Sequence, residues 1–188
     1  MKARENPFRR ERLESLAYRA PAFDWARLEA RLERIGRRGA IVGPKGHGKT
    51  TLLEQWAARH RGSIHFRIRE GQRKLDDAQR ERLRASAGGW VLVDSAEQLG
   101  WFGWLDLRRR ISRSDRLVIA AHRPGRLPTL FRCRTSPRLL AELVHELTGR
   151  TVDSESLWRR HAGNLREALR ELYDAAYQIP SPKSALSA

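Results

Sequence analysis

The sequence predicts an α/β fold of three layers, a parallel sheet covered by helices on both faces, with a small helical lid after it. Three short apolar runs, at 40–42, 90–93 and 117–121, have the length and composition of buried parallel strands. Helix-prone segments separate them, and this alternation is typical of βαβ units with right-handed crossovers. Strand patterns stop near Thr135, so we expect only helices beyond it.

The first expected elements surround a glycine-rich loop. A helix should begin after Asp24, because aspartate favours the position before the first helical turn. Its apolar residues recur at helical spacing up to Ile35, and Gly36 ends the pattern. The strand 40–42 follows, and after the loop a second helix is expected over Thr50–His60.

Further elements of the core alternate in the same way. An acid ends the most apolar of the expected strands, and an aromatic cluster at 101–104 falls within the second helix of this group. The elements are an edge strand over 64–68, a charged helix over Lys74–Ala85, a strand over Trp90–Asp94, a helix over Leu99–Ile111 and a strand over Leu117–Ala121.

Composition supports a folded chain with an excess of positive charge. Of the 188 residues, 40% are apolar and 32% charged, which is enough apolar material for a buried core. Lys and Arg number 38 against 22 Asp and Glu, giving a formal net charge of +16, nearly all from arginine. The arginines either bind DNA or another polyanion, or are spread over solvated faces and paired with acids.

Several classes of protein are excluded. The single Cys133 rules out an internal disulfide and a cysteine-built zinc site, and the six histidines lack zinc-ligand spacing. There is no G-x-S-x-G motif of serine hydrolases and no N-K-x-D motif of GTPases. No apolar stretch is long enough to span a membrane and no signal peptide is present, so we expect a soluble cytoplasmic protein that makes no contact with membranes.

The segment GPKGHGKT between the first strand and the second helix matches the phosphate-binding loop G-x-x-x-x-G-K-(S/T). Its glycines let backbone amides approach a phosphate, and the helix that follows directs its positive end at the anion. Lys49 should bridge the β- and γ-phosphates, and the hydroxyl of Thr50 should bind Mg²⁺. The residues expected to bind nucleotide here are Gly43, Pro44, Lys45, Gly46, His47, Gly48, Lys49, Thr50 and Thr51.

Polar residues at neighbouring strand ends are the candidates for catalysis. Asp94 should hold the Mg²⁺ through water. Ser95 follows it, and Glu97 is either the general base for an attacking water or a solvated glutamate at a helix start. His122, after the strand 117–121, either orients water and senses the γ-phosphate or bonds a loop carbonyl.

The C-terminal third has three expected helices. The first begins at Ser136–Pro137, the second spans Ser154–His161, and the third opens at Gly163–Asn164. Arg166 on the third helix either reaches back to the nucleotide phosphates or forms a surface ion pair with Glu167. The expected domains are an N-terminal arm, 1–23, that contributes to the nucleotide site, a core over 24–135, a lid over 136–178 and a disordered tail over 179–188.

Taken together, these segments resemble the AAA+ superfamily, in the branch of origin-recognition and clamp-loader ATPases. The resemblance covers Asn6-Pro7-Phe8, GPKGHGKT, VLVDSAEQL, AAHRP and HAGNLREAL. It implies ATP as ligand, a sheet ordered 5-1-4-3-2, His122 and Arg166 at the two sensor positions, and Tyr18 near the adenine. It also implies an arginine finger, from a neighbouring subunit, near the start of the last core strand, where Arg132 or Arg134 would match. Ser95 departs from the family because a catalytic glutamate usually stands there.

The function expected from the motif and the resemblance is that of a Mg-ATP-binding ATPase, slow or stimulated by a partner. Its nucleotide state would gate contact with a macromolecule such as DNA, a protein or further copies of the chain. One alternative is a switch or adaptor that binds ATP without hydrolysing it. A P-loop kinase for a small molecule ranks last, because kinases of that kind insert the lid between core strands.

Overall fold

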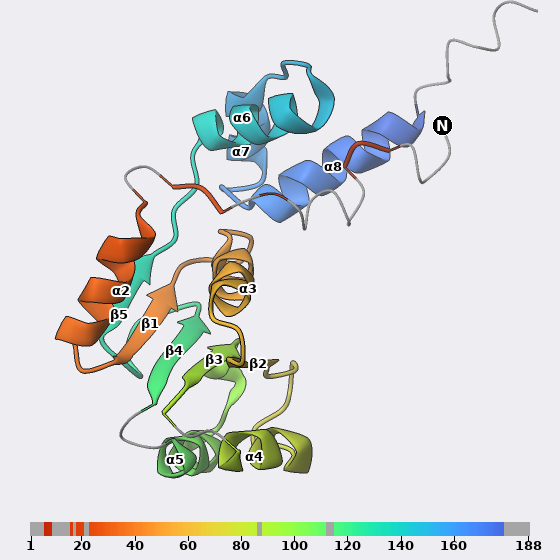
Figure 1. Ribbon diagram of the computed structural model, residues 1–188. Coiled ribbons are helices and arrows are strands. Elements are labelled where there is room, and N and C mark those ends of the chain that lie inside the picture. Colours follow the sequence, from red (N-terminus) through yellow and green to blue (C-terminus); the bar gives the residue numbers. More distant parts are fainter. Residues whose placement is uncertain are drawn as a thin grey trace, which may run out of the picture. The chain divides into compact units, whose positions relative to one another are not determined.

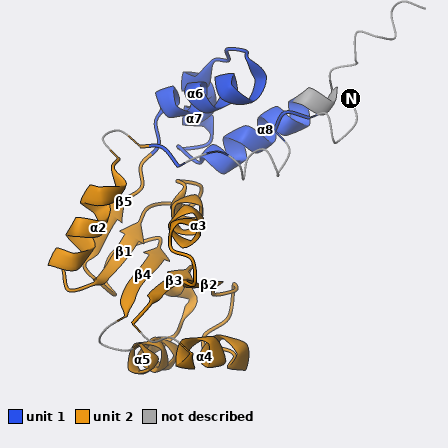
Figure 2. Ribbon diagram, in the orientation of Figure 1, with its two compact units in different colours: residues 1–19, 135–188 blue, residues 20–134 orange. Residues whose placement is uncertain are grey.

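The computed structural model describes residues 6–8, 16, 18–20, 23–85, 88–111 and 115–178. The chain divides into two compact units, shown in Figure 2: one spans Ala20–Arg134, and the other combines residues 1–19 with 135–188. We call them the core unit and the helical unit. None of the helices in the described ranges is long and apolar enough to cross a membrane.

The core unit is built on a five-stranded parallel sheet in the order β2-β3-β4-β1-β5. This is the predicted order read from the opposite edge, and it places β4 between the strand before the loop and the strand that ends in Asp94. Strand β2 lies at an edge, as its alternating pattern indicated. The strands are β1 (Arg38–Val42), β2 (Ile64–Arg67), β3 (Trp90–Asp94), β4 (Arg116–Ala121) and β5 (Thr129–Arg132).

Two pairs of helices accompany the sheet (Figure 1). Helix α2 (Trp25–Arg34) begins at Asp24, whose carboxylate accepts a hydrogen bond from the Arg27 amide at 2.7 Å, as predicted. Helix α3 (Lys49–Arg59) follows the glycine-rich loop. Helices α4 (Asp77–Arg84) and α5 (Trp101–Arg110) pack beside each other, and a single turn, η2 (Ala96–Gln98), precedes α5.

Both helices of the second pair are shorter than their helical patterns predict. Helix α4 was expected from Lys74 but begins three residues later, because Asp76 and Gln79 form a reciprocal capping box. Residues 68–76 instead form a loop that crosses the start of α5. The Arg73 carbonyl there accepts a hydrogen bond from the Gly100 amide at 2.9 Å.

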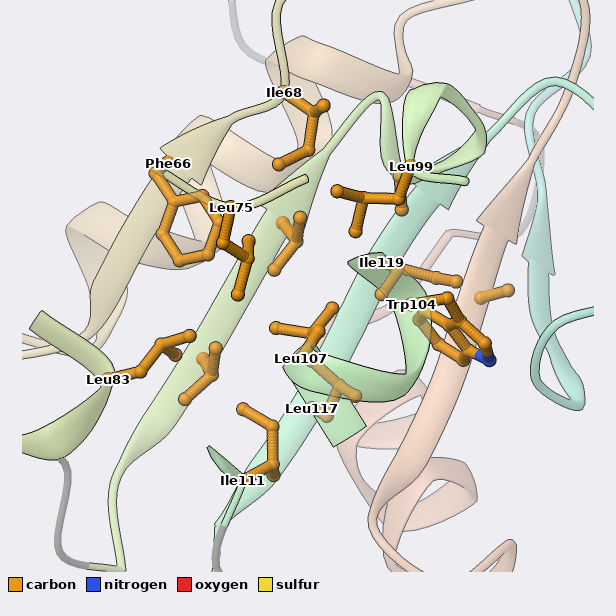
Figure 3. Packing of buried hydrophobic residues seen from close by; sticks show 14 of the residues in the cluster. Phe66, Ile68, Leu75, Leu83, Leu99, Trp104, Leu107, Ile111, Leu117 and Ile119 are labelled. Atoms are coloured by element: carbon orange, nitrogen blue, oxygen red, sulfur yellow. The ribbon is translucent and has the colours of Figure 1, made fainter. Parts of the chain in front are cut away.

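Successive side chains along each strand point to opposite faces of the sheet, so the sheet has a buried core on each face. Val91, Val93, Leu117 and Ile119 belong to a buried cluster with Trp104 and Leu107 of α5 (Figure 3). On the other face Trp56 of α3 is fully buried, with its ring centroid 5.7 Å from that of Trp25 in α2. Burial on both faces explains why the central strands are continuously apolar.

The helical unit contains α6 (Pro137–Thr148), α7 (Ser154–Arg160) and α8 (Leu165–Gln178). Ser136 caps α6 as predicted, since its hydroxyl accepts from the Leu139 amide at 3.1 Å. The described part of the N-terminal arm packs within this unit: Asn6 and Phe8 are buried, and the Asn6 side chain donates to the Tyr173 carbonyl at 3.0 Å. The expected tail, 179–188, lies outside the described residues.

Candidate nucleotide-binding site

The glycine-rich loop joins β1 to α3 at the carboxyl end of the sheet. Gly46 and Gly48 have φ values of 77° and 81°, in the left-handed region that glycine adopts without a steric penalty. Gly48 is also the N-cap of α3 and offers no side-chain cap to the first helical amides. Amides at such a helix start can bind an anion.

Gly43 is required for packing as well. A Cβ at this position would lie 2.8 Å from the Cys133 carbonyl oxygen, just after β5. The Cys133 amide donates to the Val42 carbonyl at 2.8 Å, so the close approach continues the pairing of β1 with β5. The first glycine of the motif therefore fixes where the loop leaves the sheet.

Lys49 brings a nearly buried positive charge to the loop. Its side-chain nitrogen donates to the carbonyls of Gly43 at 2.7 Å and Pro44 at 2.8 Å, and the residue is 8% exposed. These two carbonyls hold the ammonium against the loop. A positively charged side chain at the loop attracts an anion, and a phosphate group fits this position.

Thr50 and Asp94 meet beside the loop, as the predicted Mg²⁺ site requires. The Thr50 hydroxyl donates to Asp94 Oδ2 at 2.9 Å, and the Ser95 amide donates to Asp94 Oδ1 at 2.8 Å. Hydroxyl and carboxylate oxygens are ligands that Mg²⁺ prefers. Across the described ranges no group of three or more His, Cys, Asp or Glu could hold a metal ion, so a magnesium ion here would need phosphate and water oxygens too.

Glu97 turns back toward the strand ends and pairs with His122. Ser95 adopts φ 58° and ψ 37°, a left-handed conformation that costs a non-glycine residue about 1–2 kcal/mol. This bend starts the turn η2, and Glu97 Oε1 lies 2.9 Å from His122 Nδ1. The Glu97 side chain is 25% exposed, and its Oε2 is buried without a hydrogen-bond partner in the described structure. Glu97 is therefore not a freely solvated residue at a helix start, and a carboxylate, not a loop carbonyl, faces His122.

Two arginines at this site were not predicted. Arg67 ends β2 in register with Asp94, and its Nε lies 3.5 Å from Asp94 Oδ2. Arg126, between β4 and β5, donates to the Leu99 carbonyl and lies over the Trp104 ring at 5.1 Å. Burial lowers the pKa of Arg126, and the charge of Glu97 partly opposes that shift. Strand register could have indicated Arg67, whereas no sequence pattern points to Arg126.

Two histidines of the core unit have lowered pKa values, which favours their neutral form. Burial, and then the positive charge of Lys49, lower the pKa of His47. Burial also lowers the pKa of His65 on β2, although the charge of Asp94 acts in the opposite direction. A neutral imidazole at position 47 adds no further cation to the lysine already in the loop.

The remaining predicted residues are Tyr18, Arg166, Arg132 and Arg134. Tyr18 and the exposed Arg166 belong to the helical unit, and their roles at adenine and phosphate stay predictions. Arg132 is the last residue of β5 and Arg134 follows it, so neither lies near the start of the last strand, where the resemblance places an arginine finger. The irregular connection 122–128 brings the chain to β5 without a helix.

Solved structures share this architecture. The chain matches Thermotoga maritima RuvB, a Holliday junction branch migration motor, over 77% of its own length and 58% of the RuvB chain, with 19% identity and a TM-score of 0.51. Two structures of single-site variants of the same RuvB match over 77% of this chain, with TM-scores of 0.53 and 0.52 at 19% and 22% identity. They are covered over 57% and 56% of their own lengths. The chain has the fold of an AAA+ P-loop ATPase.

The likeness concerns the AAA+ fold alone, because the identities are low and the chain spans little more than half the length of these neighbours. No family model matches the sequence, and no curated protein is similar to it at a significant level. Within this fold, the loop 43–50 lies between β1 and α3, and Thr50 at the start of α3 meets Asp94 at the end of β3.

Proposed function

We propose that the chain binds Mg-ATP at the loop 43–50 and hydrolyses it slowly, and that its nucleotide state controls contact with a macromolecular partner. The observation that carries the proposal is the 2.9 Å hydrogen bond from Thr50 to Asp94, beside a lysine buried against the loop. Thr50 and Asp94 lie 44 positions apart in the chain, yet together with Lys49 they supply the groups that bind phosphate and Mg²⁺.

The residues of the loop fit a bound nucleotide. The amides at the start of α3 and the Lys49 ammonium would bind phosphate oxygens, and Thr50 with Asp94 would hold Mg²⁺. The nucleotide supplies a γ-phosphoryl group that water can attack. Tyr18 would contact the adenine and Arg166 the phosphates. Both of these last roles come from the AAA+ resemblance.

Glu97 is the proposed general base, because Ser95 stands where the AAA+ resemblance places a catalytic glutamate. Its Oε2 has no hydrogen-bond partner among the described residues and can accept a proton from water, while His122 holds Oε1 at 2.9 Å. His122 is thus a positioning residue for Glu97 in addition to its expected sensor role. Breaking this pair frees the carboxylate to rotate, which gives the site a way to respond to the nucleotide.

The test is ATP binding and steady-state phosphate release by the purified full chain, with and without DNA. Lys49→Ala and Asp94→Ala should abolish turnover. Glu97→Gln should keep ATP binding but reduce turnover about 100-fold or more, the usual contribution of a general base. Glu81→Gln is the matched control, because Glu81 is an exposed helix residue that pairs with Arg84. Unchanged turnover in Glu97→Gln would contradict the role of Glu97, and failure of the wild type to bind ATP would contradict the whole proposal.

A switch that binds ATP without hydrolysing it is the second candidate. Ser95 offers no carboxylate directly after Asp94, and Glu97 is already engaged by His122. ATP binding without turnover under any condition, DNA included, would support the switch. Stimulation by DNA would instead support the ATPase and identify its class of partner.

A further inference from the structure

The first turn of α5 presents two adjacent aromatic side chains to solvent. Trp101 and Phe102 are 75% and 76% exposed, whereas Trp104 and Leu107 on the same helix are buried against the sheet (Figure 3). The buried pair accounts for the packing of the helix, so the exposed pair is not needed for the core. Adjacent large apolar side chains left in water are typical of binding surfaces.

The loop 68–76, which we call the basic loop, is fixed beside this aromatic pair. The Arg73 carbonyl accepts from the Gly100 amide at 2.9 Å, and Gly103 lies so close that a Cβ there would be 2.2 Å from the same oxygen. The Arg73 Nε lies 3.4 Å from where a Cβ on Gly100 would be. The Arg73 backbone is therefore held at the residue that immediately precedes Trp101, and its guanidinium lies close to that residue.

The charges of this loop are available to a ligand. Arg69, Arg73 and Lys74 are exposed, and in the part of the chain that the structure describes none of them forms an ion pair. The acids of the loop are Glu70 and Asp76, and Asp76 caps α4. Nearby Arg80, by contrast, is neutralised by Asp77 at 3.0 Å and Asp106 at 3.1 Å. The aromatic pair thus adjoins positive charge that the protein itself leaves uncompensated.

We propose that Trp101, Phe102 and the basic loop bind single-stranded nucleic acid, with unpaired bases stacking on the two rings and phosphates contacting Arg73. Flat rings beside arginine and lysine are the arrangement that binds single strands without sequence preference. A duplex stacks its bases on one another and leaves no free base face for these rings. The net charge of +16 favours a polyanion over a neutral partner. The inference deepens the proposed function, on which it rests, by naming the class of partner.

The test is fluorescence anisotropy of a labelled oligothymidylate, titrated with the full chain in the absence of nucleotide. Trp101→Ala and Phe102→Ala should each weaken binding about 5-fold or more, because stacking on an aromatic ring contributes about 1–3 kcal/mol per base. Trp101→Phe should retain most of the affinity. Arg73→Gln should reduce the slope of log affinity against log salt by about 0.7, the value for one phosphate contact to a single strand.

Arg108→Gln is the matched control, since Arg108 is exposed on the last turn of the same helix and its substitution removes the same charge. It should change affinity less than Arg73→Gln does. Unchanged binding in the Trp101→Ala Phe102→Ala double variant would overturn the proposal. A duplex with the same number of phosphates that displaced the labelled oligothymidylate as well as a single strand does would also overturn the proposal. Displacement by polyglutamate of equal charge would also overturn it and point to an acidic protein partner.

This outcome is separable from that of the proposed function. Oligonucleotide binding is measured without ATP, and ATP binding is measured without oligonucleotide. Absence of ATP binding contradicts the ATPase and leaves the aromatic surface standing. Loss of oligonucleotide binding with normal ATP binding contradicts only the surface.

Discussion

The substitution Gly103→Ala tests how tightly the basic loop is packed on α5. In a helix whose surface is open, replacing glycine with alanine stabilises a protein by about 1 kcal/mol, because alanine has the higher helix propensity. At Gly103 the added Cβ would lie 2.2 Å from the Arg73 carbonyl oxygen and 3.1 Å from the Lys74 Cα. These are backbone atoms of a loop that is hydrogen-bonded to the helix start, so no flexible side chain can move away.

The expected sign is therefore reversed. Overpacking of this kind costs about 1–3 kcal/mol, and a contact this short with backbone belongs at the upper end of that range. After subtracting the gain in helix propensity, we expect the free energy of unfolding to fall by about 2 kcal/mol. For a chain of this length, such a loss lowers the midpoint of thermal unfolding by about 4–8 °C.

Urea denaturation followed by circular dichroism measures this difference. Gly89→Ala is the matched control, because a Cβ there meets nothing within 4 Å and its φ lies outside the left-handed region. The control should leave stability unchanged or raise it by a few tenths of a kcal/mol. A Gly103→Ala protein as stable as the wild type would refute the close packing of the loop. The anchoring of Arg73 beside Trp101 would then fail too.

Three further predictions concern one buried and two partly buried side chains of the core unit. His65 has a lowered pKa in the folded state because it is buried, so the unfolded chain takes up its proton first as pH falls through about 6.5. The contribution of His65 to stability is full above that pH and decreases below it. In urea titrations, His65→Gln should therefore lose less stability than the wild type between about pH 7.5 and 5.5. The same loss in both proteins would contradict this. Trp56 is fully buried, and its indole N–H has no hydrogen-bond partner in the described structure. Trp56→Phe should therefore lower the free energy of unfolding clearly less than the loss of about 3–5 kcal/mol expected for Trp56→Ala. Equal losses in the same titrations would be inconsistent with that packing. Arg126→Gln should slow ATP turnover more than it weakens ATP binding, since the guanidinium interacts electrostatically with Glu97 and donates to the Leu99 carbonyl. Equal effects in kinetic and equilibrium assays would argue against this role.

Much of the core unit follows from local sequence patterns. The strand Trp90–Asp94 was predicted with both ends correct, because four apolar residues between a glycine pair and an acid can be buried only in the centre of a sheet. The loop 43–50 was found from its glycines, two of which the structure places at positive φ where a side chain would be strained. The strand order was expected from the AAA+ resemblance. Strand β5 itself has too few apolar residues to stand out alone.

The arrangement around Glu97 was decided by tertiary structure. The sequence marks Glu97 as a candidate base, but its position depends on the left-handed turn at Ser95, which local propensity disfavours. The contact with His122 joins two strand ends, and the approach of Arg126 depends on the path of a loop with no regular structure. The same holds for the start of α4, which a capping box moved three residues beyond the helical pattern.

The sequence by itself determined the phosphate-binding loop, the alternation of strands and helices, and the acid at the end of β3, because each depends on residues close together in the chain. Only the tertiary structure decided what those residues face. Thr50 meets Asp94, Glu97 meets His122, and Arg73 lies beside Trp101 because strand register and loop packing bring together atoms that are distant along the chain. Such contacts depend on the summed packing of many residues, and no short pattern in the sequence encodes them.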